Sequence, residues 1–182
     1  FPVCLQPALA QRRISGQMPT RRALARYGLE RHWWSQATLD PGRDKVAHLV
    51  SAEEVVVVQS TAGVVTTFDA ETGRRLWSIQ LGRRDQPGWP ATTNDKLVLV
   101  ITGLTIYALD KFDGEMVWEV RLPKAPSTSP VMDRYQVYVG THDGSCYALD
   151  LRKIEELYNE NLLPAWSYQT IKWRYKTAKR LT

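Results

Sequence analysis

Short apolar runs separated by polar, glycine-containing turns fill much of the chain after residue 45. Three of these runs are rich in β-branched and aliphatic residues and span 55–59, 97–102 and 136–140. Each predicts a strand that leads into a hairpin, and the run after each hairpin is apolar on both faces, which predicts a strand packed between neighbours. A further strand is expected to begin at each of three tryptophans, Trp77, Trp118 and Trp166. The pattern therefore predicts an all-β chain.

A short string, Asp-x-x-x-Gly-x-x-x-Trp, recurs along these units. Successive aspartates are 41 and 40 residues apart, a period typical of propeller blades. Because the aspartate has the same place in every unit, we expect it to accept backbone hydrogen bonds in a turn rather than to act in catalysis or bind calcium. The glycine is expected to take the positive φ that ends this turn. The repeat residues are Asp69, Gly73 and Trp77, then Asp110, Gly114 and Trp118, then Asp150 and Trp166.

Residues 108–118, Ala-Leu-Asp-Lys-Phe-Asp-Gly-Glu-Met-Val-Trp, resemble the tryptophan-docking motif of pyrroloquinoline-quinone-like (PQQ-like) β-propeller repeats. Residues 137–150 are similar to the strand-turn-strand consensus of the same family. The resemblance covers roughly residues 46–182. It implies four-stranded blades in which each tryptophan docks against the neighbouring blade. Since closed propellers need about four to eight blades, we expect a partial propeller of about three to four blades that continues beyond the C-terminus.

The third unit departs from this pattern by an insertion. Trp166 follows Asp150 by 16 residues, whereas eight separate the corresponding residues of the other units. Apolar residues at helical spacing, with glutamates between them, predict a short amphipathic helix that ends at Pro164. The apolar positions are Leu151, Ile154, Leu157, Tyr158 and Leu162. This helix either covers the blade or meets a partner.

The N-terminal region predicts three features. Residues 1–10 resemble the end of a secretory signal peptide, the alternative being an ordinary N-terminus. Residues 11–45 form a basic segment in which Thr20 is expected to cap a short helix. Trp34 precedes Trp77 by 43 residues and is expected to occupy a degenerate repeat position. Together with the repeats over 46–182, these features predict export to the periplasm or cell envelope of a bacterium.

Charge and residue chemistry narrow the function classes. The net charge is +5, and the excess of cations lies at the two ends of the chain while the repeats are acidic. Residues 171–176 alternate aromatic and basic side chains, but continuation of a strand explains this pattern better than nucleic-acid binding. None of His32, His48 and His142 has a second ligand at metal-binding spacing. Cys146 is expected to be a small core residue.

Two function classes remain. The favoured one is an exported, non-catalytic propeller scaffold for protein–protein interaction, similar to family members that assist assembly of outer-membrane β-barrels. The alternative is a fragment of a quinoprotein dehydrogenase, for which the resemblance implies PQQ, calcium, a general-base aspartate and often adjacent cysteines. No residue here matches those motifs, so we assign no catalytic, cofactor-binding or metal residue and expect no cofactor. Envelope proteins are the expected partners. The candidate contact loops are 82–89, with Trp89 at a hairpin tip, and 151–163; the alternative for Trp89 is that it covers the blade edge, and neither loop is assigned as a site.

Overall fold

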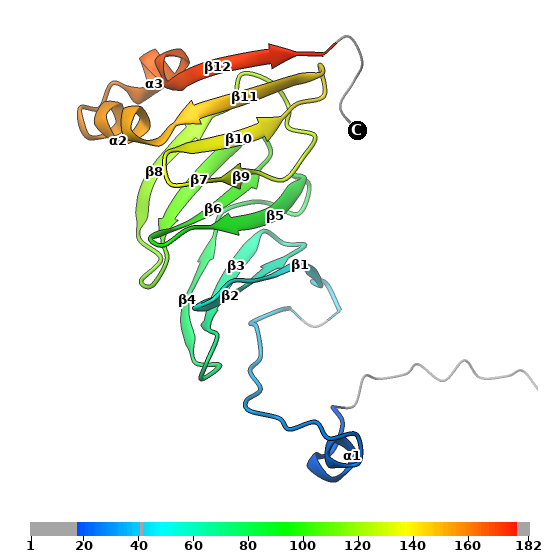
Figure 1. Ribbon diagram of the computed structural model, residues 1–182. Helices are drawn as coiled ribbons and strands as arrows, with labels where there is room; N and C mark the ends of the chain where they lie inside the picture. The colour runs from blue at the N-terminus through cyan, green and yellow to red at the C-terminus, as the bar shows by residue number, and fades with distance from the viewer. Residues whose placement is uncertain (1–17, 41, 178–182) are drawn as a thin grey trace, which may run out of the picture. The chain divides into compact units, whose positions relative to one another are not determined.

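The computed structural model describes residues 18–40 and 42–177 and contains three four-stranded antiparallel sheets within them (Figure 1). Each sheet follows chain order, so each is one up-and-down blade. Blade one consists of β1 (Val46–Ser51), β2 (Val55–Ser60), β3 (Val64–Asp69) and β4 (Arg75–Gln80). Blade two consists of β5 (Gly88–Thr93), β6 (Leu97–Thr102), β7 (Thr105–Asp110) and β8 (Met116–Arg121). Blade three consists of β9 (Val131–Met132), β10 (Gln136–Gly140), β11 (Ser145–Asp150) and β12 (Ile171–Lys176).

The predicted 82–89 loop is shorter in the structure, because its last two residues belong to β5, the first strand of the second blade. Trp89 was expected at a hairpin tip, but it lies in β5 and pairs with Ile101 of β6. The side chain of Gln59, on β2, fixes this strand to blade one: its Nε2 donates to the Trp89 carbonyl oxygen (3.0 Å), and its Oε1 accepts from the Ala91 amide (2.7 Å). The hairpin prediction was wrong because residues 82–87 connect β4 and β5, which belong to different sheets and do not pair.

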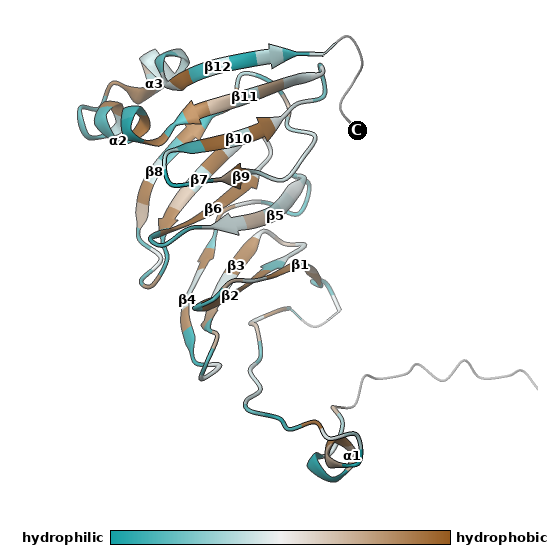
Figure 2. Cartoon of the chain, viewed as in Figure 1, coloured by the Kyte–Doolittle hydropathy of each residue, from teal (hydrophilic) through white to brown (hydrophobic). Residues whose placement is uncertain are grey.

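Two apolar clusters join successive blades. The first unites blades one and two around Trp77 of β4 and Leu109 of β7. The second unites blades two and three around Trp118, which is fully buried. Figure 2 shows apolar residues gathered on the inner strands of the blades, whereas the turns and much of β12 are hydrophilic. Each buried aliphatic side chain contributes about 1.5–3 kcal/mol, so the two clusters stabilise the contacts between neighbouring blades.

The predicted helical insertion is confirmed. It forms α2 (Leu151–Asn159), α3 (Leu163–Trp166) and a 3-10 turn over Ser167–Thr170. The apolar side of α2 is buried and packs near β8 of blade two. Pro164 was expected to end this helix, but it lies in the first turn of α3 instead. Its missing N–H costs nothing there, because the N–H groups of a first turn have no partner within the helix. The chain instead leaves α2 through Asn161, whose φ is 57°.

The outer strand of the third blade begins later than predicted. Trp166 was expected to start it, but Trp166 ends α3, and a 3-10 turn follows. β12 places Trp173 opposite Ala148 of β11, the register that the tryptophans of β4 and β8 have on β3 and β7. Trp173 follows Asp150 by 23 residues, so the insertion is longer than the tryptophan spacing implied. Trp173, not Trp166, therefore occupies the third tryptophan position of the repeat.

The N-terminal unit, which extends to Trp34, contains the predicted short helix. This helix, α1, spans Arg21–Ala25, and the Thr20 hydroxyl caps it by accepting from the Ala23 amide (3.2 Å). Trp34 is 62% exposed and lies outside any strand, so its assignment to a repeat position was wrong. The predicted signal remnant over 1–10 lies outside the described residues. Among the described residues, no helix has both the length and the apolar character needed to cross a membrane.

Candidate interaction surface

The aspartates of the repeat motif are engaged by their own turns. Asp69 Oδ1 accepts from the Thr72 hydroxyl and the Thr72 amide, each at 2.7 Å, and these bonds hold the pKa of Asp69 below its ordinary value. Asp110 Oδ1 accepts from the Phe112 amide (2.8 Å) in the equivalent turn. Asp150 uses the same geometry to cap α2, accepting from the Arg152 amide (3.0 Å). The tendency of aspartate to accept hydrogen bonds from backbone amides that follow it thus starts the turns at Asp69 and Asp110 and caps α2 at Asp150.

The glycine and tryptophan of the motif meet between blades one and two. Gly114 has a φ of 76°, and a Cβ built on it would lie 2.6 Å from Cγ of Trp77. The Trp77 indole donates to the Lys111 carbonyl oxygen at 3.0 Å. Lys111 itself is buried, and its ammonium group pairs with Glu54 of blade one. A side chain at Gly114 would therefore displace the indole from blade two.

Trp118 lacks this hydrogen bond. It is fully buried, and within the described residues its Nε1 has no acceptor. The residue that follows the aspartate in blade three is Leu151, which begins α2, so its carbonyl oxygen faces along the helix axis. The insertion has thus removed the acceptor that the ordinary turn provides to Trp77.

A cleft of about 570 Å³ lies at the end of the blades where the β5–β6 and β9–β10 turns meet the start of α2. We call it the Tyr135 cleft after one of its lining residues, whose side chain is 50% exposed. The guanidinium carbons of Arg134 and Arg152 lie 5.9 and 5.7 Å from the centre of the Tyr135 ring. Within the described part of the chain, neither arginine has a carboxylate at ion-pair distance. Both are therefore available to a partner.

The turn that carries Tyr135 is held by hydrogen bonds to the Asp133 carboxylate. Asp133 Oδ1 accepts from the amides of Tyr135 (2.6 Å) and Gln136 (2.8 Å), and its Oδ2 accepts from the Tyr138 hydroxyl (2.9 Å). These bonds, led by that of the Tyr135 amide, hold the pKa of Asp133 below its ordinary value. An exposed tyrosine stacked with arginines on a fixed turn has the residue types and preorganisation typical of a protein-binding hot spot.

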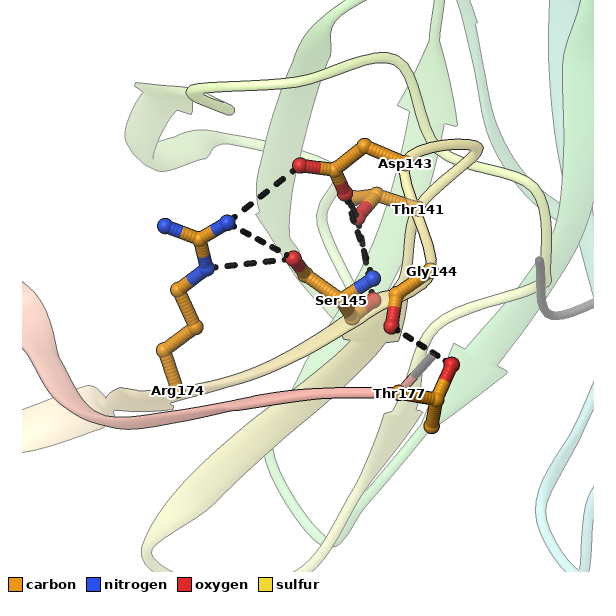
Figure 3. A network of polar contacts seen from close by, with 6 residues as sticks. All are labelled: Thr141, Asp143, Gly144, Ser145, Arg174 and Thr177. Carbon is orange, nitrogen blue, oxygen red and sulfur yellow. Dashed lines mark hydrogen bonds and ion pairs between the residues drawn. The ribbon is translucent and has the colours of Figure 1, made fainter. Parts of the chain in front are cut away.

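A polar network at the opposite end of blade three ties β12 to the β10–β11 hairpin (Figure 3). Arg174 Nη2 donates to Asp143 Oδ2 (3.3 Å) and to the Ser145 hydroxyl (2.9 Å), while the Thr141 hydroxyl donates to Asp143 Oδ1 (2.7 Å). The Arg174 guanidinium also stacks on Tyr147. Ser145 and Thr141 are fully buried, which excludes them as accessible nucleophiles. The network therefore has a structural role, fixing β12 to the β10–β11 hairpin, and we call it the Arg174 clasp.

The sequence analysis predicted one of the segments that form the Tyr135 cleft. The insertion over 151–163 supplies Arg152 to the Tyr135 cleft, while the loop before Trp89 lies at the other end of blade two. Sequence reasoning missed Arg134 and Tyr135; their signal is a large aromatic beside a cation in a turn between two apolar strands. Among the described residues, no three His, Cys, Asp or Glu side chains come together as a metal group.

Three stacked four-stranded antiparallel sheets with the Asp-x-x-x-Gly turn define a PQQ-like β-propeller. A family model described as outer membrane protein assembly factor BamB matches residues 31–93 and 61–178, so the chain belongs to this family. BamB of Salmonella typhimurium is 30% identical over 96 residues, which are 47% of this chain and 24% of that protein. The chain therefore spans about a quarter of this relative's length.

Solved structures agree on the fold. BamB from Moraxella catarrhalis superposes with a TM-score of 0.51 and 25% identity, covering 68% of this chain and 33% of that one. The WD40 domain of Neurospora crassa Pan2 superposes with a TM-score of 0.53 over 74% of this chain and 39% of that one. At 12% identity, the second likeness shows the propeller fold alone.

Proposed function

We propose that this chain is part of an exported, non-catalytic propeller scaffold that binds other proteins of the bacterial cell envelope during assembly of outer-membrane proteins. The observation that carries this proposal is the Tyr135 cleft, in which an exposed aromatic is stacked with two arginines that lack carboxylate partners within the described residues. Membership of the BamB family supports the assembly role, and the repeat aspartates support a scaffold because each is engaged by its own turn or helix cap.

The mechanism is presentation of side chains by a rigid frame. Stacked blades fix the turns at their ends, so binding at the cleft requires little ordering of the backbone. Tyr135 supplies apolar area with few rotatable bonds, and Arg134 and Arg152 supply donors for acceptors on the partner. We propose that the scaffold needs no cofactor for this binding.

Site-specific photocrosslinking in living bacteria tests the proposal. A crosslinking amino acid at Tyr135 is expected to capture an outer-membrane assembly protein, identified by mass spectrometry. The same substitution at Tyr168, which is 65% exposed and lies outside the cleft, serves as the matched control. Equal capture from both positions, or capture of no assembly protein, would contradict the proposal.

Affinity measurements then quantify the site. Tyr135→Ala is expected to weaken binding of the captured partner by about tenfold or more, as truncation of a hot-spot residue costs at least about 1.4 kcal/mol. Tyr168→Ala is expected to leave the affinity within about twofold. Thermal unfolding of both variants checks that the fold is retained.

A further inference from the structure

A second pocket lies at the other end of blade two, between blades one and two. The β2–β3 and β6–β7 hairpins and the 82–87 loop surround a volume of about 210 Å³. We call it the Arg84 pocket. Its lining includes Arg84 and Gln86 from the loop, His48 from β1 and Thr102 from β6. It is separate from the Tyr135 cleft, with which it shares no residue.

Backbone contact between the hairpin of blade one and the start of this loop fixes one wall of the pocket. The amides of Leu81 (3.0 Å) and Gly82 (3.3 Å) both donate to the Gly63 carbonyl oxygen. Gly63 has a φ of 84°, and a Cβ on it would lie 2.5 Å from the carbonyl carbon of Gly82. Gly82 in turn lies against the Thr102 side chain. The wall is therefore formed before any ligand arrives.

The pocket lining carries cationic and donor groups and no carboxylate. Within the described part of the chain, Arg84 is in no ion pair. The nearby acids do not line the pocket: Asp44 accepts from the Thr61 hydroxyl (2.8 Å) and the Ala62 amide (2.9 Å), and Asp85 follows Arg84 in the loop. The pocket therefore favours a negatively charged occupant.

The hydrogen-bonding groups agree with this charge. Gln86 Oε1 accepts from the Arg83 amide (3.2 Å), so the side chain of Gln86 has its NH₂ group to offer as a donor. His48 Nε2 lies 3.2 Å from the Gly88 carbonyl oxygen, which can only accept, so the N–H of this nitrogen is already engaged and His48 is not counted among the donors to an occupant. The Arg84 guanidinium adds donors in a planar fork. A carboxylate, which accepts at both oxygens, complements this set.

Size restricts the occupant further. Pockets for small-molecule ligands measure about 300–1,000 Å³, whereas this one is about 210 Å³, enough for a single side chain. We infer that the Arg84 pocket receives the carboxylate of an aspartate or glutamate side chain presented by a partner protein. This inference deepens the proposed function, on which it rests for the partner's place in the envelope, by naming the chemistry of a second contact.

A peptide titration tests the inference without an identified partner. The probe is a short peptide, blocked at both ends, with Asp-Glu at its centre; its counterpart carries Asn-Gln. Binding is followed by NMR through the Gln86 side-chain amide and the Arg84 Nε–H signals. The acidic peptide is expected to shift both signals saturably, and the neutral peptide is expected to shift neither. Equal shifts from the two peptides would overturn the inference.

Two arginine variants separate the pocket from general surface charge. Arg84→Gln is expected to weaken the acidic peptide by about tenfold, since it removes a charge-assisted hydrogen bond. Arg83→Gln removes the same charge from the neighbouring position, which does not line the pocket, and is expected to change the affinity less than twofold. Equal losses from both variants would refute the pocket. Thermal unfolding confirms that each variant is folded.

A titration with acetate tests whether the Arg84 pocket is a site for any small anion rather than for an acidic side chain of a partner protein. If acetate shifts the same signals at the same concentration as the acidic peptide, the pocket is a small-anion site and the docking inference fails. The outcomes for the two proposals are independent. Arg84-dependent peptide binding without any Tyr135 crosslink to an assembly protein would refute the proposed function and leave the pocket, and the reverse result would refute the pocket.

Discussion

Replacing Trp77 and Trp118 separately with phenylalanine tests how the blades are joined. Both indoles are buried between blades, and both substitutions remove the same ring area. Only Trp77 donates a hydrogen bond, at 3.0 Å to the Lys111 carbonyl oxygen. Trp118 Nε1 is buried without an acceptor in the described residues. We expect Trp77→Phe to destabilise the protein more than Trp118→Phe.

The magnitude follows from these two environments. Trp77→Phe leaves the buried carbonyl of Lys111 unpaired, which costs about 1–3 kcal/mol. Trp118→Phe removes a buried, unpaired donor, whose burial costs about 1–3 kcal/mol by mutational data. Because the loss of packing is similar in the two variants, it cancels in the comparison. The unfolding free energy of Trp77→Phe should therefore fall below that of Trp118→Phe by at least about 2 kcal/mol.

Urea unfolding followed by far-UV circular dichroism measures this difference without depending on tryptophan fluorescence. An equal dependence on urea concentration in both variants is the control that the unfolding transition is the same. For a chain of this size, about 2 kcal/mol corresponds to a difference in Tm of about 4–8 °C. Equal stability of the two variants, or lower stability of Trp118→Phe, would refute the role assigned to the Lys111 carbonyl.

Three further predictions concern the turns and the Arg174 clasp. Gly114→Ala should destabilise the protein more than Gly103→Ala, because both glycines have positive φ but only at Gly114 would the Cβ strike the buried indole; urea unfolding of the two variants checks this. Asp150→Ala should cost about 1 kcal/mol by removing the cap of α2, and hydrogen exchange of the α2 amides should rise. The hydrogen bond from Thr141, followed by those from Ser145 and the charge of Arg174, holds the pKa of Asp143 below its ordinary value. This stabilisation is complete above the unfolded pKa of about 3.9 and is lost as pH falls through the lower folded value. Unfolding measured from pH 6 to pH 2 should therefore show a steeper loss of stability for the parent protein than for Asp143→Asn; parallel curves would contradict this.

The repeat was readable from the sequence because its signals are local. Strand runs, hairpin glycines and the turn aspartates depend on residues a few positions apart, and the structure places strands at 55–60, 97–102 and 136–140 close to the predicted runs. The helix over Leu151–Asn159 was readable for the same reason, since its apolar spacing lies within a single segment.

The Tyr135 cleft could be predicted only in part. Its arginines come from the β9–β10 turn and from α2, which are separate in sequence, and nothing in either segment alone shows that both guanidiniums lie over one ring. The Arg84 pocket similarly depends on contact between the Gly63 turn and Gly82 of the next connection. Each site is a product of how neighbouring blades and segments pack.

The sequence by itself determined the blade period, the turn chemistry and the helical insertion, because all three follow from local backbone preferences and side-chain periodicity. The tertiary structure alone decided which tryptophan occupies the third repeat position. β11 and β12 pair although the whole insertion lies between them in the sequence, and their register places Trp173 opposite Ala148. The spacing from Asp150, which favoured Trp166, therefore did not identify the third tryptophan. The tertiary structure also left Trp118 without an acceptor, because the third blade begins a helix where the other two turn.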